Sequence, residues 1–427
     1  MAYDPDARER EAMAEVAATR IARPIGWVLF VGFLLLVAVG PLSELAAAFG
    51  RSGSVWSEPW PSAGADADLL AASRTAIAEI ERRADQETAL VRAVRPWGQL
   101  ALTALLRYGN EKAYVGRGEW LVYREDFDHL TARGPSGQGR RADPAATIAV
   151  FAAELERRGV ALLLLPVPAK PAVHPESLAA HPPQEAPRNA DDAALATRLR
   201  ELGVALLDPL DLLRGAARDE PAYLATDTHW RPAAMDAVAR ETAIRLRALA
   251  DLPVGDESAL REEPAWVAAI GDTAALLELP PARPRFAPER VETRPVAGAD
   301  GAAWRPERRA PVLLLGDSFS AIYAQAELGF GAGAGLAERL SFHLGLPLDR
   351  ILRNAGGASA TRAALAAELE RDPRRLAGVR VVVWQLAARE LSQGDWRNVP
   401  LPAPPAPPAP SGDRPTAAAD AAAAESR

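Results

Sequence analysis

The sequence predicts an α/β domain with a mainly parallel sheet covered by helices on both faces, preceded by a single N-terminal transmembrane helix. Two patterns carry this prediction. After residue 144, short and continuously apolar runs alternate with stretches of helical periodicity, which is typical of parallel strands joined by crossover helices. Near the N-terminus, residues 24–43 are uncharged, and a helix of that length spans about 30 Å of hydrocarbon.

The arginines that flank the uncharged run predict its orientation. Four of them precede it, namely Arg8, Arg10, Arg20 and Arg23, whereas only Arg51 follows closely. The positive-inside bias therefore places residues 1–23 in the cytoplasm and the rest of the chain outside. A cleaved signal peptide is the alternative, because small residues follow at 46–48, although its leader would be long and would contain five acidic residues.

These patterns divide the chain into five predicted regions. They are, in order, a cytoplasmic N-terminus at 1–23, an anchor at 24–43, a helical membrane-proximal region at 44–106, an α/β domain at 107–398 and a Pro/Ala-rich disordered tail at 399–427. Apolar residues at three- and four-residue steps between 68 and 108 indicate the membrane-proximal helix. The tail contains PLPAPPAPPAP, which has no core-forming pattern.

Within the domain, Gly-rich punctuation at 115–119 leads into a short strand near 120–123. Buried parallel strands are then predicted at 161–167, 203–207, 311–315 and 379–384. Helices are predicted at 144–158, 232–250, 334–344 and 360–371. Residues 255–310 are rich in Pro and Arg and less periodic, so we expect an excursion between strands of the sheet.

Composition excludes several functional classes. The net charge is −7 and the pI is about 5.5, so the chain lacks the basic footprint of a nucleic-acid-binding protein. There is no cysteine, which removes disulfides, thiol nucleophiles and thiolate metal sites. The five histidines lack the close pairing of HExxH, and we therefore expect neither a metal nor a cofactor.

A hydroxyl follows one of the predicted buried strands. The run 311–315 leads into Gly316, Asp317 and Ser318, which places the serine at the carboxyl edge of a parallel sheet, where open α/β folds bind ligands. Free backbone N–H groups at such a strand-to-helix turn could also stabilise an oxyanion. The alternative is that Asp317 or Ser318 only caps the next helix.

The second candidate segment is TDTHWRP at 226–232. Asp227 and His229 are two residues apart, so an extended loop can bring both to one site. A neutral imidazole can take a serine proton, and a carboxylate on its other ring nitrogen fixes the tautomer. Alternatively, Asp227 caps the following helix and His229 packs under Trp230. Together with Ser318, the pair completes the set of nucleophile, base and orienting carboxylate.

A family resemblance adds to these motifs. GDSFS at 316–320, the Asp-x-His pair and Asn354 in RNAGGASATR resemble the SGNH hydrolase-like group, specifically the alginate O-acetyltransferase family of periplasmic polysaccharide-acetylating proteins. Further similar stretches lie at 108–126, 162–176 and 333–351, so the resemblance covers residues 107–391.

The resemblance implies an SGNH hydrolase-like fold with permuted strand order, because Asp-x-His precedes the serine here. It also implies that Ser318 is the nucleophile, His229 the base and Asp227 its partner. One position departs from the expected pattern: Gln385 stands where we expect an acid in many relatives, which puts any role of that side chain in doubt.

Residues after other predicted strands are candidates for oxyanion or substrate binding. Asn354 precedes Gly356 and Gly357, so its amide or a glycine N–H could complete an oxyanion hole, although asparagine is also common in turns before glycine. Arg389 follows the last predicted strand and could hold a sugar carboxylate, but a surface ion pair is the commoner use of such an arginine.

Three further side chains are weaker candidates. Lys170 is one of only two lysines and follows a predicted strand in a proline-rich loop. Tyr323 and Trp230 could stack on a sugar ring, and packing in the core is the alternative for both.

Three functions follow from this reasoning. The resemblance implies O-acetyl transfer to an exported polysaccharide through an acyl-enzyme on Ser318. Acetyl-CoA is absent outside the cytoplasm, so the implied acetyl donor partner is a membrane-bound O-acyltransferase, with the catalytic domain held at the bacterial inner membrane and facing the periplasm. The alternatives are a carbohydrate esterase, since the same three residues work with water as acceptor, and a non-catalytic scaffold of an envelope polysaccharide complex.

Overall fold

Five parallel strands form the central sheet in the computed structural model of this chain. The structure describes residues 25, 27–33, 89–132, 143–256, 258–354 and 356–404. The strands are β3 (Ala161–Val167), β4 (Ala205–Leu206), β9 (Val312–Gly316), β10 (Leu348–Leu352) and β11 (Val381–Ala387). Their order across the sheet is β10-β9-β11-β3-β4, and each neighbouring pair is parallel. The predicted α/β class with a mainly parallel sheet is confirmed.

Alternate residues of the central strands face two separate hydrophobic cores. On β9, Leu314 belongs to one core and Leu313 to the other, and both are fully buried. Val383 and Val382 divide in the same way on β11. Because both faces of these strands are covered, residues 312–315 of β9 and 381–384 of β11 are continuously apolar rather than alternating, which is the pattern that predicted them.

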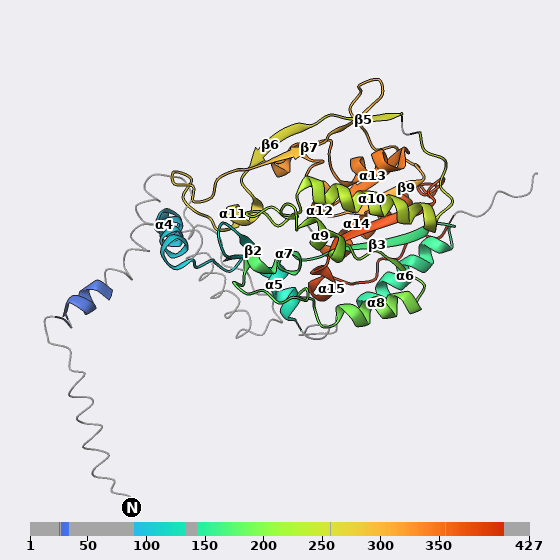
Figure 1. Cartoon of the computed structure of the whole chain (residues 1–427). Helices are drawn as coiled ribbons and strands as arrows, with labels where there is room; N and C mark the ends of the chain where they lie inside the picture. The colour runs from blue at the N-terminus through green and yellow to red at the C-terminus, as the bar shows by residue number, and fades with distance from the viewer. Residues whose placement is uncertain are drawn as a thin grey trace, which may run out of the picture. The chain divides into compact units, whose positions relative to one another are not determined.

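Helices cover both faces of the sheet (Figure 1). One core includes residues of α9 (Leu210–Ala216), α10 (Pro232–Leu249) and α13 (Leu336–Leu344). The other includes residues of α6 (Pro144–Glu156), α8 (Asp192–Glu201) and α14 (Gly357–Arg371). The four helices predicted from periodicity are therefore present, with ends shifted by a few residues.

Two short antiparallel ribbons lie in the region predicted as an excursion. In the first, β5 (Leu260–Glu262) pairs with β8 (Val296–Gly298), and in the second, β6 (Ala265–Ala269) pairs with β7 (Glu289–Thr293). The helix α11 (Asp272–Leu276) follows β6. The residues of β6 alternate between partly buried and exposed, so this strand is not buried on both faces as β9 and β11 are.

The remaining described elements of the domain are short. A hairpin of β1 (Ala113–Val115) and β2 (Leu121–Tyr123) leads into α5 (Arg124–Thr131), and β2 is the strand predicted near 120–123. The others are α7 (Lys170–Val173), η2 (Pro175–Ser177), α12 (Ser318–Ala321), η3 (Ala326–Leu328) and α15 (Glu390–Gln393).

The helix α4 (Ala89–Leu106) belongs to a different compact unit from the domain that begins at Arg107. No helix within the described ranges is long and apolar enough to span a bilayer. The anchor predicted at 24–43 lies outside the described residues, apart from 25 and 27–33. Of the predicted tail, 405–427 lie outside them as well, whereas Leu401 packs in the core beside α6.

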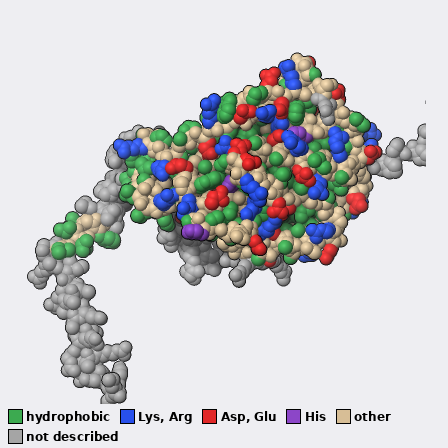
Figure 2. Space-filling view, in the orientation of Figure 1, with side chains coloured by type: hydrophobic (Ala, Val, Ile, Leu, Met, Phe, Trp, Pro, Cys, Tyr) green, Lys and Arg blue, Asp and Glu red, His purple; other side chains and the backbone are tan. Residues whose placement is uncertain are grey.

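Charged side chains of both signs are interspersed on the face of the domain that Figure 2 shows. Opposite charges placed close together cancel at long range, so this face presents no extended field of one sign.

Candidate active site

Ser318 lies where β9 ends and α12 begins. Gly316 closes the strand, and a Cβ at this position would lie 2.4 Å from Ser320 Oγ, so the turn requires glycine. The Asp317 carboxylate caps α12 by accepting a hydrogen bond from the Phe319 N–H at 2.8 Å. The capping role considered for Asp317 is thus observed, and it leaves Ser318 as the first residue of the helix.

Ser318 lines a cavity of about 320 Å³. Three other predicted site residues, Asn354, Gly357 and Arg389, line the same cavity. They follow β10 and β11, which flank β9 in the sheet. The parallel topology therefore brings together four residues that are far apart in the sequence.

The two oxyanion candidates differ in how they are held. The Asn354 amide donates to Gln325 Oε1 at 2.6 Å. Gly357 begins α14 with a φ of +65°, a backbone conformation that favours glycine. The next N–H, that of Ala358, already donates to Glu390 Oε2 at 2.8 Å. Burial raises the pKa of this Glu390 carboxyl, which also lines the cavity.

Arg389 forms an ion pair inside the fold. One guanidinium nitrogen donates to Asp126 Oδ1 at 2.9 Å, and Asp126 is almost fully buried. Glu125 lies 3.7 Å from the Arg389 Nε. Burial alone lowers the pKa of Arg389, but the charges of Asp126 and Asp317 outweigh it and raise the pKa above the usual value. The ion-pair alternative is therefore present, although the pair is buried and lines the cavity.

Asp227 and His229 form a buried hydrogen-bonded pair. The distance from Asp227 Oδ1 to His229 Nδ1 is 2.6 Å, and the same oxygen accepts from the His229 N–H at 2.9 Å. The other carboxylate oxygen of Asp227 accepts from the Asp272 N–H at 2.8 Å. With Asp227 on Nδ1, the imidazole keeps Nε2 for a different partner, as a general base requires.

The charges in this pair shift both pKa values in the direction that favours the ionised forms. Burial alone raises the pKa of Asp227, but the charge and hydrogen bonds of His229 and the Asp272 N–H hold it below the usual value. Burial alone lowers the pKa of His229, and the carboxylates of Asp227, Asp272 and Asp317 outweigh it and raise the pKa. An imidazolium formed here is therefore stabilised.

The segment that carries His229 packs directly on α12. The His229 and Phe319 rings are 4.7 Å apart between centroids. Trp230 Nε1 donates to the Phe319 carbonyl at 3.0 Å, and the Tyr323 hydroxyl donates to the Trp230 carbonyl at 2.7 Å. His229 Nε2 is buried and has no hydrogen-bond partner among the residues that the structure describes. The imidazole thus packs against the residue that follows Ser318, with one ring nitrogen unused.

Trp230, Tyr323 and Lys170, like Asp227 and His229, are not among the residues that line the cavity of Ser318. All three are fully buried, which matches the core-packing alternative for the two aromatic residues. Lys170 Nζ donates to the carbonyls of Leu121 and Ala225, at 2.7 and 3.2 Å. Burial lowers the pKa of Lys170 to about 8. The lysine ties β2 to the loop that carries Asp227.

Two carboxylates that the sequence reasoning missed support the same loop. Glu289 on β7 accepts from the N–H groups of Ala225 and Thr226, at 2.9 and 2.7 Å. Asp272, at the start of α11, accepts from the Thr228 N–H at 2.7 Å. Neither residue stands in a motif, and a Gly-Asp pair after a half-exposed strand is a weak signal.

Gln385 connects the serine turn to β11. Its Oε1 accepts from the Ser320 hydroxyl at 2.5 Å and from the Asp317 N–H at 3.1 Å. Its Nε2 donates to Asp317 Oδ1 at 2.8 Å. The glutamine that departs from the expected pattern therefore fixes the two residues on either side of Ser318 and Phe319.

Within the described ranges, the ligand atoms of Asp227, His229 and Asp272 lie within 4.8 Å of one another, close enough to hold a metal ion. The 2.6 Å contact with Asp227 already engages the His229 nitrogen that such an ion would need. The arrangement fits an orienting hydrogen bond better than a ligand set.

Comparison with known proteins identifies the family of the domain. Residues 113–388 match the family described as the SGNH hydrolase-like domain of acetyltransferase AlgX. The chain belongs to this family. Over 277 residues it is 31% identical to the Pseudomonas aeruginosa protein named "Probable alginate O-acetylase AlgJ", covering 62% of this chain and 66% of that protein. The protein of the same name from Pseudomonas syringae pv. tomato is 29% identical over 225 residues, covering 51% and 56%.

This chain spans less than two thirds of the length of these two relatives. Among solved structures, it is similar to the O-acetyltransferase domain of Pseudomonas putida AlgJ, with a TM-score of 0.50 and 23% identity. The alignment covers 66% of this chain and 92% of that domain. The predicted SGNH hydrolase-like fold is thereby confirmed.

Proposed function

We propose that the protein transfers acetyl groups to hydroxyls of an exported polysaccharide through an acyl-enzyme on Ser318. The observation that carries the proposal is the placement of Ser318 on a cavity at the sheet edge, with the Asp227-bound imidazole packed against the next residue. Membership of an acetyltransferase family and the name of the AlgJ relatives support acetyl transfer as the reaction and an alginate-like polymer as the acceptor class.

In the first half-reaction, the Ser318 oxygen attacks the acetyl carbonyl carbon while its proton passes to Nε2 of His229. Asp227 holds the Nδ1–H and stabilises the imidazolium, as the raised pKa of His229 favours. The candidate oxyanion donors on the cavity wall are the backbone N–H groups of Ser318 and Gly357 and the side-chain amide of Asn354. The tetrahedral species collapses, and His229 returns the proton to the departing group.

In the second half-reaction, a sugar hydroxyl attacks the acetyl-enzyme. His229 Nε2 takes the proton of the hydroxyl, and the bond between the acetyl group and Ser318 breaks to restore the serine. Water in place of the sugar would make the protein an esterase, because the same three side chains serve either acceptor.

For the setting of this reaction, we propose a single-pass anchor at 24–43 in the bacterial inner membrane, with the domain in the periplasm. The uncharged run and the arginines before it support this placement. No acetyl-CoA is present in that compartment, and a membrane-bound O-acyltransferase is therefore the proposed donor partner.

The test is mass spectrometry of the full-length protein incubated with an activated acetyl ester, with and without alginate oligosaccharides. The proposal predicts acetylated oligosaccharide that disappears in His229→Ala. Release of free acetate at the same rate with and without oligosaccharide would identify an esterase instead. No turnover in either condition would favour the scaffold. The control is His181→Ala, because His181 is an exposed histidine outside the site.

A further inference from the structure

We propose that Asp272 is a second carboxylate partner of His229, a positioning residue that orients the imidazole and supports its protonated form together with Asp227. The inference rests on the proposed function of the Ser318 site. It adds a residue that comes from the half-exposed ribbon region at 255–310, outside every motif in the sequence.

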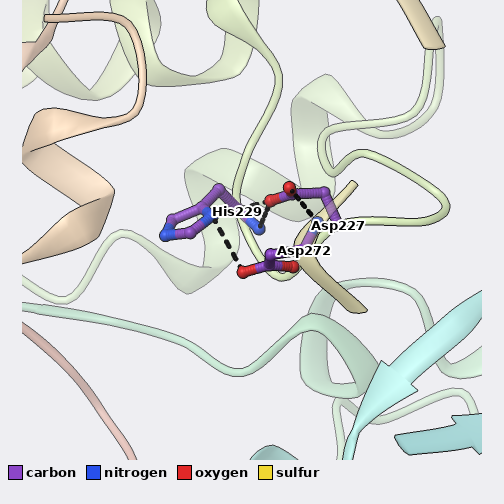
Figure 3. A group of neighbouring side chains, drawn as sticks. All are labelled: Asp227, His229 and Asp272. Atoms are coloured by element: carbon purple, nitrogen blue, oxygen red, sulfur yellow. Dashed lines mark hydrogen bonds and ion pairs between the residues drawn. The ribbon is translucent and has the colours of Figure 1, made fainter. Parts of the chain in front are cut away.

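The geometry shows two carboxylates on one edge of the imidazole (Figure 3). Asp227 Oδ1 lies 2.6 Å from His229 Nδ1, and Asp272 Oδ2 lies 3.6 Å from the same nitrogen. The other ring nitrogen points away from both carboxylates (Figure 3). One N–H therefore faces two acceptors, of which Asp227 holds the shorter contact.

The two oxygens of Asp272 have different tasks. Oδ1 accepts from the Thr228 N–H at 2.7 Å and from the Thr228 hydroxyl at 3.0 Å, and so it holds the loop between Asp227 and His229. Oδ2 is the oxygen that faces His229 Nδ1. A substitution that keeps the first oxygen and removes the charge can therefore separate the effect on the loop from the effect on the imidazole.

The backbone holds Asp272 in this place. A Cβ at Gly271 would lie 2.3 Å from the Thr226 carbonyl, so the chain passes too close for any other residue. The Ala274 N–H donates to that same Thr226 carbonyl at 3.0 Å. The first turn of α11 is thus fixed against the loop at 226–229, and the position of Asp272 does not depend on its own side chain alone.

The charged groups around His229 define what Asp272 adds. Asp227, Asp272 and Asp317 act on the imidazole as negative charges. The buried Lys170 ammonium interacts with the carboxylates of Asp227, Asp272 and Glu289. Burial and the Asp227 charge raise the pKa of Asp272, whereas the charge of His229 lowers it. Protonation of His229 therefore stabilises the ionised carboxylate of Asp272.

Asp272→Asn is the variant that tests the proposal. The amide oxygen can still accept from Thr228, while the amide nitrogen places a donor where Oδ2 faced His229 Nδ1. Losing a negative charge near an imidazolium lowers the pKa of the imidazole, so the acid limb of the rate should move to lower pH. We expect acylation by 4-nitrophenyl acetate to slow about fivefold, the effect of a partly exposed ion pair, because Asp272 Oδ2 lies 3.6 Å from His229 Nδ1 and the side chain is 42% exposed.

The matched control is Asp256→Asn. Asp256 Oδ1 also accepts from a backbone N–H and a hydroxyl, both of Ser258, but it lies in an exposed turn away from the site. The Asp256→Asn protein should acylate at the wild-type rate. Asp272→Ala, which removes both oxygens, should be slower than Asp272→Asn and should also unfold more easily.

The decisive measurement is an NMR titration of the His229 imidazole in the full-length protein, assigned with His229→Gln. We expect His229 in Asp272→Asn to titrate at lower pH than in the wild type, with Asp256→Asn unchanged. Titration of His229 at the same pH in all three proteins would overturn the inference. The titration needs no turnover, so a protein that shows the shift but no acetyl transfer would contradict the proposed function and leave the contact between Asp272 and His229 established.

Discussion

Replacing Gln385 by leucine should destabilise the fold and slow acylation at Ser318. The side chain is almost fully buried and makes three hydrogen bonds, one with Ser320 and two with Asp317. The Ser320 hydroxyl is fully buried and would be left without this acceptor, whereas Asp317 lines the cavity, where water can replace part of the loss. Each buried polar group left unpaired costs roughly 1 to 3 kcal/mol, and the cost for Asp317 lies at the smaller end of this range. We therefore expect Gln385→Leu to lower the free energy of unfolding by about 3 kcal/mol.

Urea unfolding at neutral pH measures this loss directly, from the midpoint at an unchanged slope. The control is Gln393→Leu. The Gln393 amide donates to the Glu125 carbonyl at 2.9 Å near the surface, so its loss should lower the free energy of unfolding by less than about 1 kcal/mol. An equal and small loss in both variants would refute the reasoning, because the serine turn would then not depend on the bonds from β11.

Three more predictions follow from the same geometry. Gly316→Ala places a Cβ 2.4 Å from Ser320 Oγ, so thermal unfolding should show that the free energy of unfolding falls by about 1 to 3 kcal/mol. Wild-type stability would show that the turn does not require glycine. Asp227→Asn should lower the melting temperature most near pH 5 to 6. The lowered pKa of Asp227 stabilises the folded protein above about pH 4, and this stability is lost as the pH falls. The raised pKa of His229 stabilises the folded protein below about pH 6.5, and this stability is lost as the pH rises. A pH-independent difference would show that the pair is not ionised. Asn354→Ala should slow acylation about 100-fold with little change in stability, and unchanged kinetics would make Asn354 a turn residue only.

The parts of the protein that the sequence predicted correctly have local signals. Strands such as β9 and β11 are buried on both faces, so each contains a run of apolar residues, at 312–315 in β9 and at 381–384 in β11. Ser318 follows one of these runs, and the two residues of the Asp-x-His pair are close in the chain. Parallel topology then places Asn354 and Arg389 near the serine, because the carboxyl ends of neighbouring strands meet at one edge.

What the sequence did not reveal depends on contacts between distant segments. Asp272 begins the short helix α11 and Glu289 lies on the half-exposed strand β7, and their roles follow only from the backbone groups that they meet in the fold. Lys170 and Tyr323 follow a strand and a helix turn that lead toward the site, but nothing local tells whether such a side chain points into a cavity or into the core. The partner of Gln385 is likewise fixed by strand pairing.

The acyl-enzyme on Ser318 is the central claim, and intact-protein mass spectrometry after mixing with an activated acetyl ester tests it most directly. The account predicts a mass gain of one acetyl group in the wild type, mapped by peptide analysis to Ser318, and no gain in Ser318→Ala with the fold intact. Because the three side chains act as one unit, Ser318→Ala and His229→Ala combined should slow ester turnover little more than either alone. An acetyl group on Ser320 or elsewhere, or one that persists in Ser318→Ala, would contradict the account.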